Sequence, residues 1–588
     1  MKRITLLILL TISLFGCEKY LDKVEESTGM TGEDVFTDYL NFRKFEDRMY
    51  KDMHNYLSAG DYTYIAALCD EGHMGPGWET ITVAQNGDWL RSYKTGQALQ
   101  FYGVWNGWES IRIANMVLEN LYQLEGIATQ EQINELKGQA HFMRAWYYYE
   151  FLKRQGGMPY ITHSLGGQDN FALPRLSVHE TALMIAADCD TAAGLLPDRW
   201  DNANLGRPTE GAAMALKSSA LLVSASPTNN PDGDQSRWEL VAQAAWDLID
   251  FSQSTGRYKL LTCNSTDHVT YMIPRAADSI TATINYTGGF DSIFLYQPFH
   301  DEIIWEHYPS SYDGGTFTVF TVPSLNSGGV IQGFSPTVNI VDLFETSNGL
   351  AIEDDPAYNP DDPYNNRDPR FYHSIVFNGE RWTTRKVKGK IVYIELWAGG
   401  RERLNAPLYS YTGYLARKFW GKDVDQWSGA RPPYTHTIYF RYAEILMQYA
   451  EAANEIGGPN YTLPGASMSA VEAVNLVRAR VKMPPVNNQY LGSKEAFRER
   501  IKNERAVEFY LEGKRLFDLS RWGDAHKIEH KALYALDITL DVSKPNGYRY
   551  TKASTPFFTL GFEQKHYKWP IPLEDAMMFP EFEQNPGW

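Results

Sequence analysis

The chain has 588 residues and a formal net charge of −17, so it is long enough for a sizeable core and strongly acidic. The acidic balance argues against nucleic acid as a partner, because phosphate groups require a basic face. The chain has four cysteines and no CxxC spacing, which argues against a disulfide framework or a zinc site.

The N-terminus has the pattern of a bacterial lipoprotein signal. Lys2 and Arg3 precede an apolar stretch, 4–12, that is too short to span a bilayer. Gly16 places a small residue directly before Cys17. We therefore expect residues 1–16 to be removed as a signal peptide, Cys17 to carry lipid, and residues 17–32 to form a polar tether. An ordinary secretory signal and a buried N-terminal strand are the alternatives.

The next part of the chain, about 33–256, is mainly helical in pattern. Asp34 can cap a first helix that runs through Tyr50, and Pro208 can open another. Further helices are predicted over 104–122, 133–152, 178–196 and 238–251. Alanines are dense between 212 and 245, which allows antiparallel helices to approach closely. We expect helix pairs stacked like tetratricopeptide repeats, although no strict period is present.

The amino-acid composition changes over about 257–437, where Gly, Pro, Asn and Asp are frequent. Short strands are predicted over 303–308, 371–377 and 391–397. This segment is predicted to be a loop-rich insertion, and loops on a rigid scaffold usually carry binding sites. Helices resume over about 438–530, with segments 438–456, 470–480 and 495–519. The prediction is a mainly α fold, with small β elements, in a single body over 33–588.

The segment 503–522 concentrates charged residues three and four apart. Its members include Glu504, Glu508 and Glu512, with Arg515 and Arg521 placed to form ion pairs with them. A catalytic carboxylate cluster is possible, but a structural polar network is favoured, because buried charges are normally paired. No GxSxG, HExxH, Walker or GxGxxG motif is present. We therefore expect no enzymatic activity, with a lipid-anchored glycosidase as a less favoured alternative.

Aromatic residues make up 14% of the chain, including 37 Tyr and 16 Trp. Most are expected in the core, but flat apolar side chains beside polar groups also suit sugar rings. Two segments, 70–91 and 301–334, combine the two kinds of side chain. The candidate ligand-binding residues are Asp70, Trp78, Asn86, Trp89, Arg91, Trp305, Tyr308, Tyr312 and Phe334.

Three further patterns are given their simplest interpretation. The motif DEGH at 70–73 is predicted to be a surface loop. The oxygen-rich segment 230–235 lacks a full calcium-binding loop, so a turn is favoured over a Ca²⁺ site, and no cofactor is expected. Cys69, Cys189 and Cys263 can form at most one disulfide, or remain three buried thiols.

Seven segments, in order along the chain, resemble the SusD/RagB family. They are RAWYYYEFLKRQGGMP (144–159), GRPTEGAAMALKSSALL (206–222), SPTVNIVDLFETSNG (335–349), RYAEILMQYAEAANE (441–455), AVNLVRARV (473–481), NERAVEFYLEGKRLFDLSRW (503–522) and WPIPLEDAMMFPEFEQNPGW (569–588).

The resemblance implies an outer-membrane, cell-surface lipoprotein of a Bacteroidetes-type bacterium. Members of the family use tetratricopeptide-like helix pairs to support an irregular ligand face. They cover a SusC-like TonB-dependent transporter and bind glycans, or in some branches peptides. The expected function is thus capture of a glycan and its delivery to such a transporter, with peptide capture as the alternative. No family binding motif can be transferred residue by residue to the loops of this chain.

Overall fold

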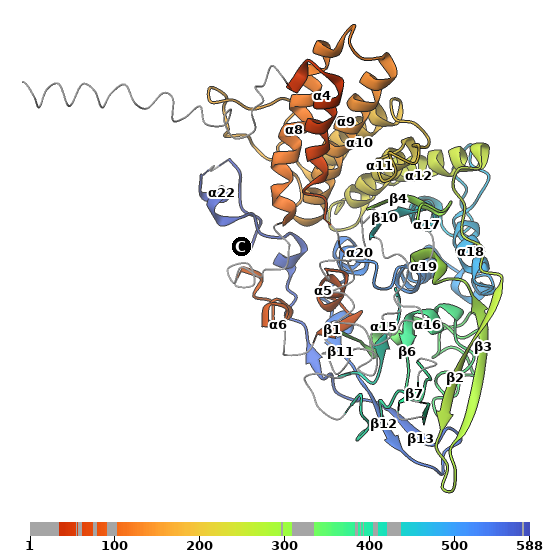
Figure 1. The fold of residues 1–588 in the computed structure, drawn as a ribbon. Coiled ribbons are helices and arrows are strands. Elements are labelled where there is room, and N and C mark those ends of the chain that lie inside the picture. The colour runs from red at the N-terminus through yellow and green to blue at the C-terminus, as the bar shows by residue number, and fades with distance from the viewer. Residues whose placement is uncertain are drawn as a thin grey trace, which may run out of the picture.

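The computed structural model describes residues 35–54, 56, 61–74, 79–90, 103–295, 298–307, 334–382, 386–387, 390–391, 393–403, 410–419, 437–578 and 581–588. The fold is mainly helical, and every sheet within these ranges has two strands (Figure 1). The predicted fold class is therefore confirmed.

The scaffold is a series of helices in which each packs against the next along the chain. Its members are α4 (Tyr39–Glu46), α8 (Gly107–Asn120), α9 (Gln130–Arg154), α10 (Val178–Ala193), α11 (Glu210–Ala225) and α12 (Gln235–Thr255). Helix α12 packs against α17 (Tyr442–Gly457), which in turn packs against α18 (Ala470–Arg480) and α19 (Lys494–Glu508). The stack thus continues past the loop-rich middle of the chain, as the tetratricopeptide-like prediction requires (Figure 1).

Local sequence explains where these helices begin and end. Thr129 and Gln132 form a capping box at the start of α9, and Ser177 and Glu180 form another at the start of α10. Helix α12 ends at Gly256, whose left-handed conformation (φ 70°) suits glycine. Alanines of α11 are fully buried where its neighbours approach. The predicted helix 470–480 has the bounds of α18, and the helices predicted over 133–152, 178–196 and 238–251 differ from α9, α10 and α12 by at most four residues at either end.

The strands form short, separate pairs. The pairs are β1 (Gly72–Met74) with β5 (Phe334–Pro336), β2 (Ser265–Ile273) with β3 (Ile280–Gly288), β4 (Ile303–His307) with β10 (Thr437–Arg441), β6 (Ile375–Val376) with β9 (Leu415–Ala416), β7 (Lys386–Val387) with β8 (Lys390–Ile391), β11 (Ala532–Leu533) with β14 (Phe558–Thr559), and β12 (Leu536–Leu540) with β13 (Tyr548–Lys552). All of them are antiparallel.

Short helices complete the described part of the chain. They are α5 (Asp61–Ala67), α6 (Glu79–Gln85), α13 (Ser292–Leu295), α15 (Val338–Leu343), α16 (Pro369–Ser374), α20 (Arg515–Trp522), α21 (Ile528–Lys531) and α22 (Leu573–Met578). Single 3-10 turns lie at η1 (Asp47–Tyr50), η2 (Gly103–Asn106), η3 (Leu121–Leu124), η4 (Asn488–Tyr490) and η5 (Gln564–Tyr567).

Three predictions about secondary structure are corrected. The strand predicted over 371–377 is mostly helix α16, because Asp368 caps a turn that has Pro369 at its first position. Among the described residues of the strand predicted over 391–397, Ile391 alone lies in a strand, β8. The helix predicted over 495–519 is two helices, α19 and α20, since the chain between them turns through left-handed Leu511 (φ 60°) and Gly513 (φ 70°).

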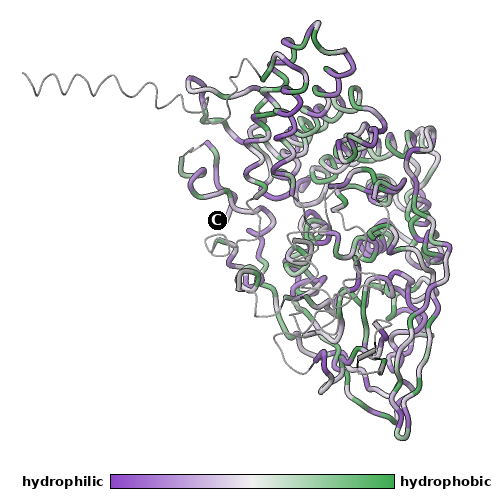
Figure 2. The backbone as a smooth tube through the Cα atoms, viewed as in Figure 1, coloured by the Kyte–Doolittle hydropathy of each residue, from purple (hydrophilic) through white to green (hydrophobic). Residues whose placement is uncertain are grey.

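Hydrophobic and hydrophilic positions are mixed along the scaffold helices (Figure 2). Within the described ranges, no helix is both long enough and apolar enough to cross a membrane. Cys69, Cys189 and Cys263 are all buried and unbridged, so the three-thiol alternative is confirmed. The 230–235 segment is a turn, in which the Asp234 side chain caps α12 through the Ser236 N–H.

Candidate functional site

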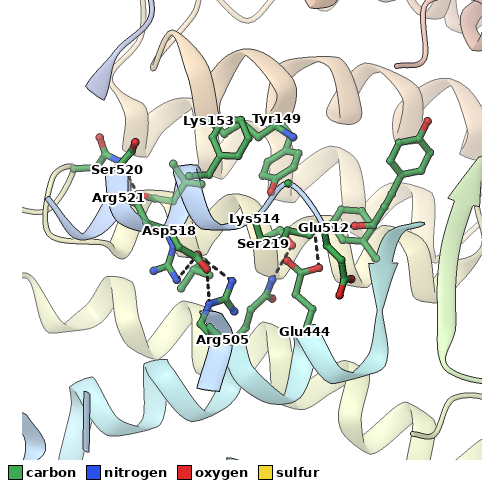
Figure 3. A pocket seen from close by; sticks show the side chains of 18 of the residues that line it. Tyr149, Lys153, Ser219, Glu444, Arg505, Glu512, Lys514, Asp518, Ser520 and Arg521 are labelled. Atoms are coloured by element: carbon green, nitrogen blue, oxygen red, sulfur yellow. Dashed lines mark hydrogen bonds and ion pairs between the residues drawn. The ribbon is translucent and has the colours of Figure 1, made fainter. Parts of the chain in front are cut away.

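A central cavity of about 80 Å³ lies between the scaffold and the second half of the chain (Figure 3). Residues of α9, α11, β10, α17, α19 and α20 line it. Its aromatic wall consists of Tyr56, Trp146, Tyr149, Tyr439, Phe440, Phe517 and Tyr567. By volume the cavity holds several water molecules.

Charged side chains around this cavity are held by partners. The Lys514 ammonium lies 2.9 Å from a carboxylate oxygen of Glu444. Asp518 accepts hydrogen bonds from Arg505 at 2.8 and 3.0 Å and from Arg521 at 2.9 Å (Figure 3). The cavity is therefore enclosed by ion pairs that join helices, and this pairing is typical of bracing.

Lys153 projects into the aromatic side of the same cavity. Its ammonium donates to the Glu150 carboxylate and to the Tyr56 hydroxyl, and it lies 4.9 Å from the centre of the Tyr149 ring. Burial lowers the pKa of Lys153 to about 7, although the nearby Glu150 carboxylate opposes this effect.

The charged segment of α19 and α20 belongs to a larger buried network centred on Arg441. Its guanidinium donates to Glu302 at 3.0 Å, to Glu508 at 2.6 Å, and to Glu512 at 2.8 Å. Arg480 also donates to Glu302 and Glu508. The carboxylates of Glu302, Glu508 and Glu512 are bonded to buried arginines, which supports the structural interpretation of the segment.

The partners in that network differ from the predicted ones. Glu508 contacts Arg370, Arg441 and Arg480, which come from three other elements, and not the nearby Arg515. Arg515 instead pairs with Asp70, more than four hundred residues away in sequence. The spacing of charged residues over 503–522 predicts a network, but arginines of elements distant in sequence are the ion-pair partners of Glu508.

A second, wider cavity of about 300 Å³ lies beside the end of β4. Asp47, Tyr50, Arg207 and His307 line it, together with residues 203–206. The Arg207 guanidinium lies 2.7 Å from Asp47 and 5.6 Å from the centre of the Tyr50 ring. This cavity combines an aromatic ring with polar groups, the arrangement that suits a sugar.

The cavity beside β4 includes one residue, His307, at a boundary of the described part of the chain. His307, the last described residue before 308–333, is the register partner of Thr437, the first described residue after 420–436. Tyr50 and Arg207 line this cavity but are not among the ligand-binding residues predicted from the sequence. Residues 206–208, GRP, begin one of the segments that resemble the SusD/RagB family, and this position alone does not indicate contact with a ligand.

Four predicted ligand residues are buried, and the prediction of an exposed ligand face is wrong for them. Asp70 is 2% exposed, accepts from Arg515 at 2.9 and 2.8 Å, and contacts the His530 ring at 2.7 Å. The whole DEGH segment is buried, so it is not a surface loop. Phe334 is fully buried in β5 and crosses over Gly72, where a Cβ would lie 2.0 Å from its ring.

The two buried tryptophans have structural partners. Trp89 donates to the Ala84 carbonyl at 3.1 Å and packs against the rings of His566 and Trp588 near the C-terminus. Trp305 donates to the Gly206 carbonyl at 3.0 Å, so it supports the wall of the cavity beside β4 from within the core.

The remaining candidates stay predictions. Asn86 is exposed at the end of α6, where its side-chain amide donates to the Thr82 carbonyl at 2.8 Å. Trp78, Arg91, Tyr308 and Tyr312, and the lipidation candidate Cys17, lie outside the described residues. No group of three or more His, Cys, Asp or Glu side chains in the described ranges could hold a metal ion.

The structure thus combines a helix-pair scaffold with a loop-rich second half, and the carboxylates around Arg441 are paired with arginines. The SusD family model matches residues 301–588, and a second model, described as starch-binding associating with outer membrane, matches residues 19–222. The chain therefore belongs to the SusD/RagB family.

Individual relatives support this assignment. The chain is 23% identical to SusD-like protein P25 of Formosa agariphila, over 98% of this chain and 97% of that protein. A SusD-like protein from Bacteroides fragilis has the same fold, with a TM-score of 0.70, 22% identity, and coverage of 95% of this chain and 99% of that one. A SusD-like carbohydrate-binding protein from the same species gives a TM-score of 0.67 at 18% identity, over 93% and 100%.

A third solved structure is similar over its full length. Surface glycan-binding protein A from Bacteroides fluxus has a TM-score of 0.56 and 20% identity, over 93% of this chain and 98% of that one. At these identities the structural likeness establishes the fold.

Proposed function

We propose that the protein is a non-enzymatic, cell-surface glycan-binding lipoprotein. The observation that carries the proposal is family membership across both parts of the chain, with one matching model described as starch-binding. Two proteins of the same fold are themselves named as carbohydrate-binding or glycan-binding. The paired state of the buried carboxylates around Arg441 is also consistent with a binding protein, since glycosidic catalysis requires an acid and a base beside the substrate.

The proposed ligand face combines the cavity beside β4 with the sequence candidates that remain. The cavity contributes Tyr50, Arg207 and His307. The candidates are Trp78, Asn86, Arg91, Tyr308 and Tyr312. In this proposal aromatic side chains contact the apolar faces of sugar rings, and the polar groups bind hydroxyls.

The proposed delivery partner is a SusC-like TonB-dependent transporter in the outer membrane. The proposed anchor is lipid on Cys17, since 1–16 has the composition of a removable signal. The tether 17–32 would let the body move relative to the membrane while the ligand is handed over.

Isothermal titration of the chain from residue 18 against a panel of oligosaccharides tests the function. We expect saturable binding of at least one glycan without product release. If the protein binds peptides but no glycan, its ligand is a peptide rather than a glycan. If it releases sugars from a glycan, and substitution of one carboxylate stops the release, the protein is a glycosidase.

Substitutions test the ligand face. Trp78→Ala and Tyr312→Ala should each weaken glycan affinity about tenfold or more, because an aromatic contact in a binding face is typically worth over 1 kcal/mol. Tyr122→Ala is the matched control, since Tyr122 is a 66% exposed aromatic residue in the turn η3, which follows the scaffold helix α8. Equal losses in all three variants would contradict the proposed face, provided that their melting temperatures are unchanged.

A further inference from the structure

The hairpin of β2 and β3 has two edges, and in the described part of the chain another backbone segment pairs with the β2 edge. On the β2 side, the Met272 N–H donates to the Gly379 carbonyl at 2.8 Å, and the Arg381 N–H donates to the Thr270 carbonyl at 2.8 Å. Thr270 and Met272 therefore direct their backbone groups away from β3. In Figure 1, β3 forms the outer margin of the molecule.

The register identifies the backbone groups on the open edge. Thr270 is opposite Thr283, and Met272 is opposite Thr281. Since opposed residues of an antiparallel pair either both bond to each other or both point outward, Thr281, Thr283 and Asn285 direct their N–H and C=O groups away from β2. Thr287, next in this series, confirms the direction, because its carbonyl bonds the His373 ring at 3.0 Å.

This open edge lacks the features that usually protect a strand. The nine residues of β3, ITATINYTG, include no charge and no proline, and four are β-branched threonines or isoleucines within the first five. The side chains of Thr281, Thr283 and Asn285 are exposed. In the described ranges no other backbone group pairs with these three residues.

We propose that β3 is a self-pairing edge through which two copies of this chain associate. With the strands antiparallel about Thr283, that residue faces its own copy and Thr281 faces Asn285 of the second copy. The three outward residues then exchange about six backbone hydrogen bonds. A two-fold interface needs such self-complementarity, because the same surface must serve as both partners.

Charge favours a second copy as the occupant. The chain carries a net charge of −17, so most surfaces of two copies repel each other, whereas β3 brings no charge to the contact.

A strand pair alone buries less area than a stable interface needs, so association in solution should be weak. Confinement of the two copies to one membrane surface would raise their effective concentration. The proposal is independent of the ligand, because β3 lines neither cavity described above.

Disulfide trapping tests the pairing directly. Opposed Cα atoms in a bonded antiparallel pair lie about 5.5 Å apart, a separation that suits a disulfide. Under mild oxidation, Thr283→Cys in the chain from residue 18 should form a covalent dimer at least about tenfold faster than Thr266→Cys, an exposed position on β2. The three native thiols in this part of the chain are buried.

Sedimentation of the unmodified chain supplies a second measurement. The average mass should rise at concentrations on the order of 0.1–1 mM, and Thr283→Lys should remove the rise by opposing like charges on the axis. Thr283→Pro should act similarly, because it removes an outward N–H and leaves the bonds to β2 intact.

Two outcomes would overturn the proposal. One is equal cross-linking of Thr283→Cys and Thr266→Cys in folded protein. The other is a monomer whose mass is independent of both concentration and Thr283→Lys, which would leave β3 to a strand of a different protein.

Discussion

Buried ion pairs join residues of this molecule that are distant in sequence. Asp70, after α5, holds Arg515 at the start of α20 through two hydrogen bonds of 2.8 and 2.9 Å. The Arg515 guanidinium holds the pKa of the Asp70 carboxyl well below its ordinary value, although burial opposes that shift. Asp70, a ligand-binding candidate in the sequence analysis, therefore stabilises the fold through a buried ion pair.

Asp70→Asn should lower the free energy of unfolding by about 3–5 kcal/mol, because it leaves a buried guanidinium without its counter-charge. Urea denaturation measures the change. Asp190→Asn is the control, since Asp190 pairs with Lys217 at the surface and its loss should cost at most about 1 kcal/mol. Similar values for the two variants would contradict the assigned role of Asp70.

The pKa of the neighbouring Glu71 is shifted in the opposite direction from that of Asp70, so this residue should make the protein less stable as the pH rises. Burial raises the pKa of this carboxyl from 4.5 to about 8, while the Leu511 N–H, which donates to it at 3.0 Å, opposes the shift. Between these values the folded chain holds a proton that the unfolded chain has released. The free energy of unfolding should therefore fall as the pH rises from about 4.5 to about 8, by up to about 1.4 kcal/mol per pH unit.

Glu71→Gln should remove this contribution, so the stability of the variant relative to the unmodified chain should increase as the pH rises through this window. Denaturation series at pH 5, 6.5 and 8 measure it. Glu239→Gln, at an exposed position of α12, should leave the dependence unchanged. A Glu71→Gln curve parallel to that of the unmodified chain would show that Glu71 is ionised in the folded protein.

At the scale of elements, helix starts follow local rules and are individually testable. Ser177 accepts a hydrogen bond from the Glu180 N–H at 3.1 Å, and the Glu180 carboxylate accepts one from the Ser177 N–H at 2.9 Å. Ser177→Ala should lower the free energy of unfolding by about 1 kcal/mol. Thr191→Ala on the same helix should change it by less than about 0.5 kcal/mol, because its hydroxyl bonds only the Ala187 carbonyl one turn earlier. Equal effects would indicate that the cap does not stabilise α10.

Local rules fail where a short element is fixed by neighbours far along the chain. The segment 371–377 is apolar enough for a strand, but the cap at Asp368 and the ion pairs of Arg370 with Glu504 and Glu508 stabilise α16. The hairpin 265–288 has a polar outer face and a buried inner face. This alternation is typical of a strand pair, whereas the sequence analysis predicts a loop-rich insertion over this range.

At the scale of the whole molecule, the proposed anchor and the proposed ligand face are separate parts of the chain. Cys17→Ala should release the protein from the membrane fraction without changing its glycan affinity. Fractionation of cells followed by titration of the released protein measures both quantities. A loss of affinity on this substitution would contradict the separation of tether and site.

The sequence by itself determined the helical class, the stacking of helix pairs, the family, and the existence of a buried charged network. These properties depend on periodicity, caps and spacing, which are local in the chain. Tertiary structure alone decided which side chains are available to a ligand. Asp70, Trp89, Trp305 and Phe334 have the composition of a binding face, but each meets a partner distant in sequence that removes it from solvent. Burial is set by such long-range contacts, and no local pattern records them.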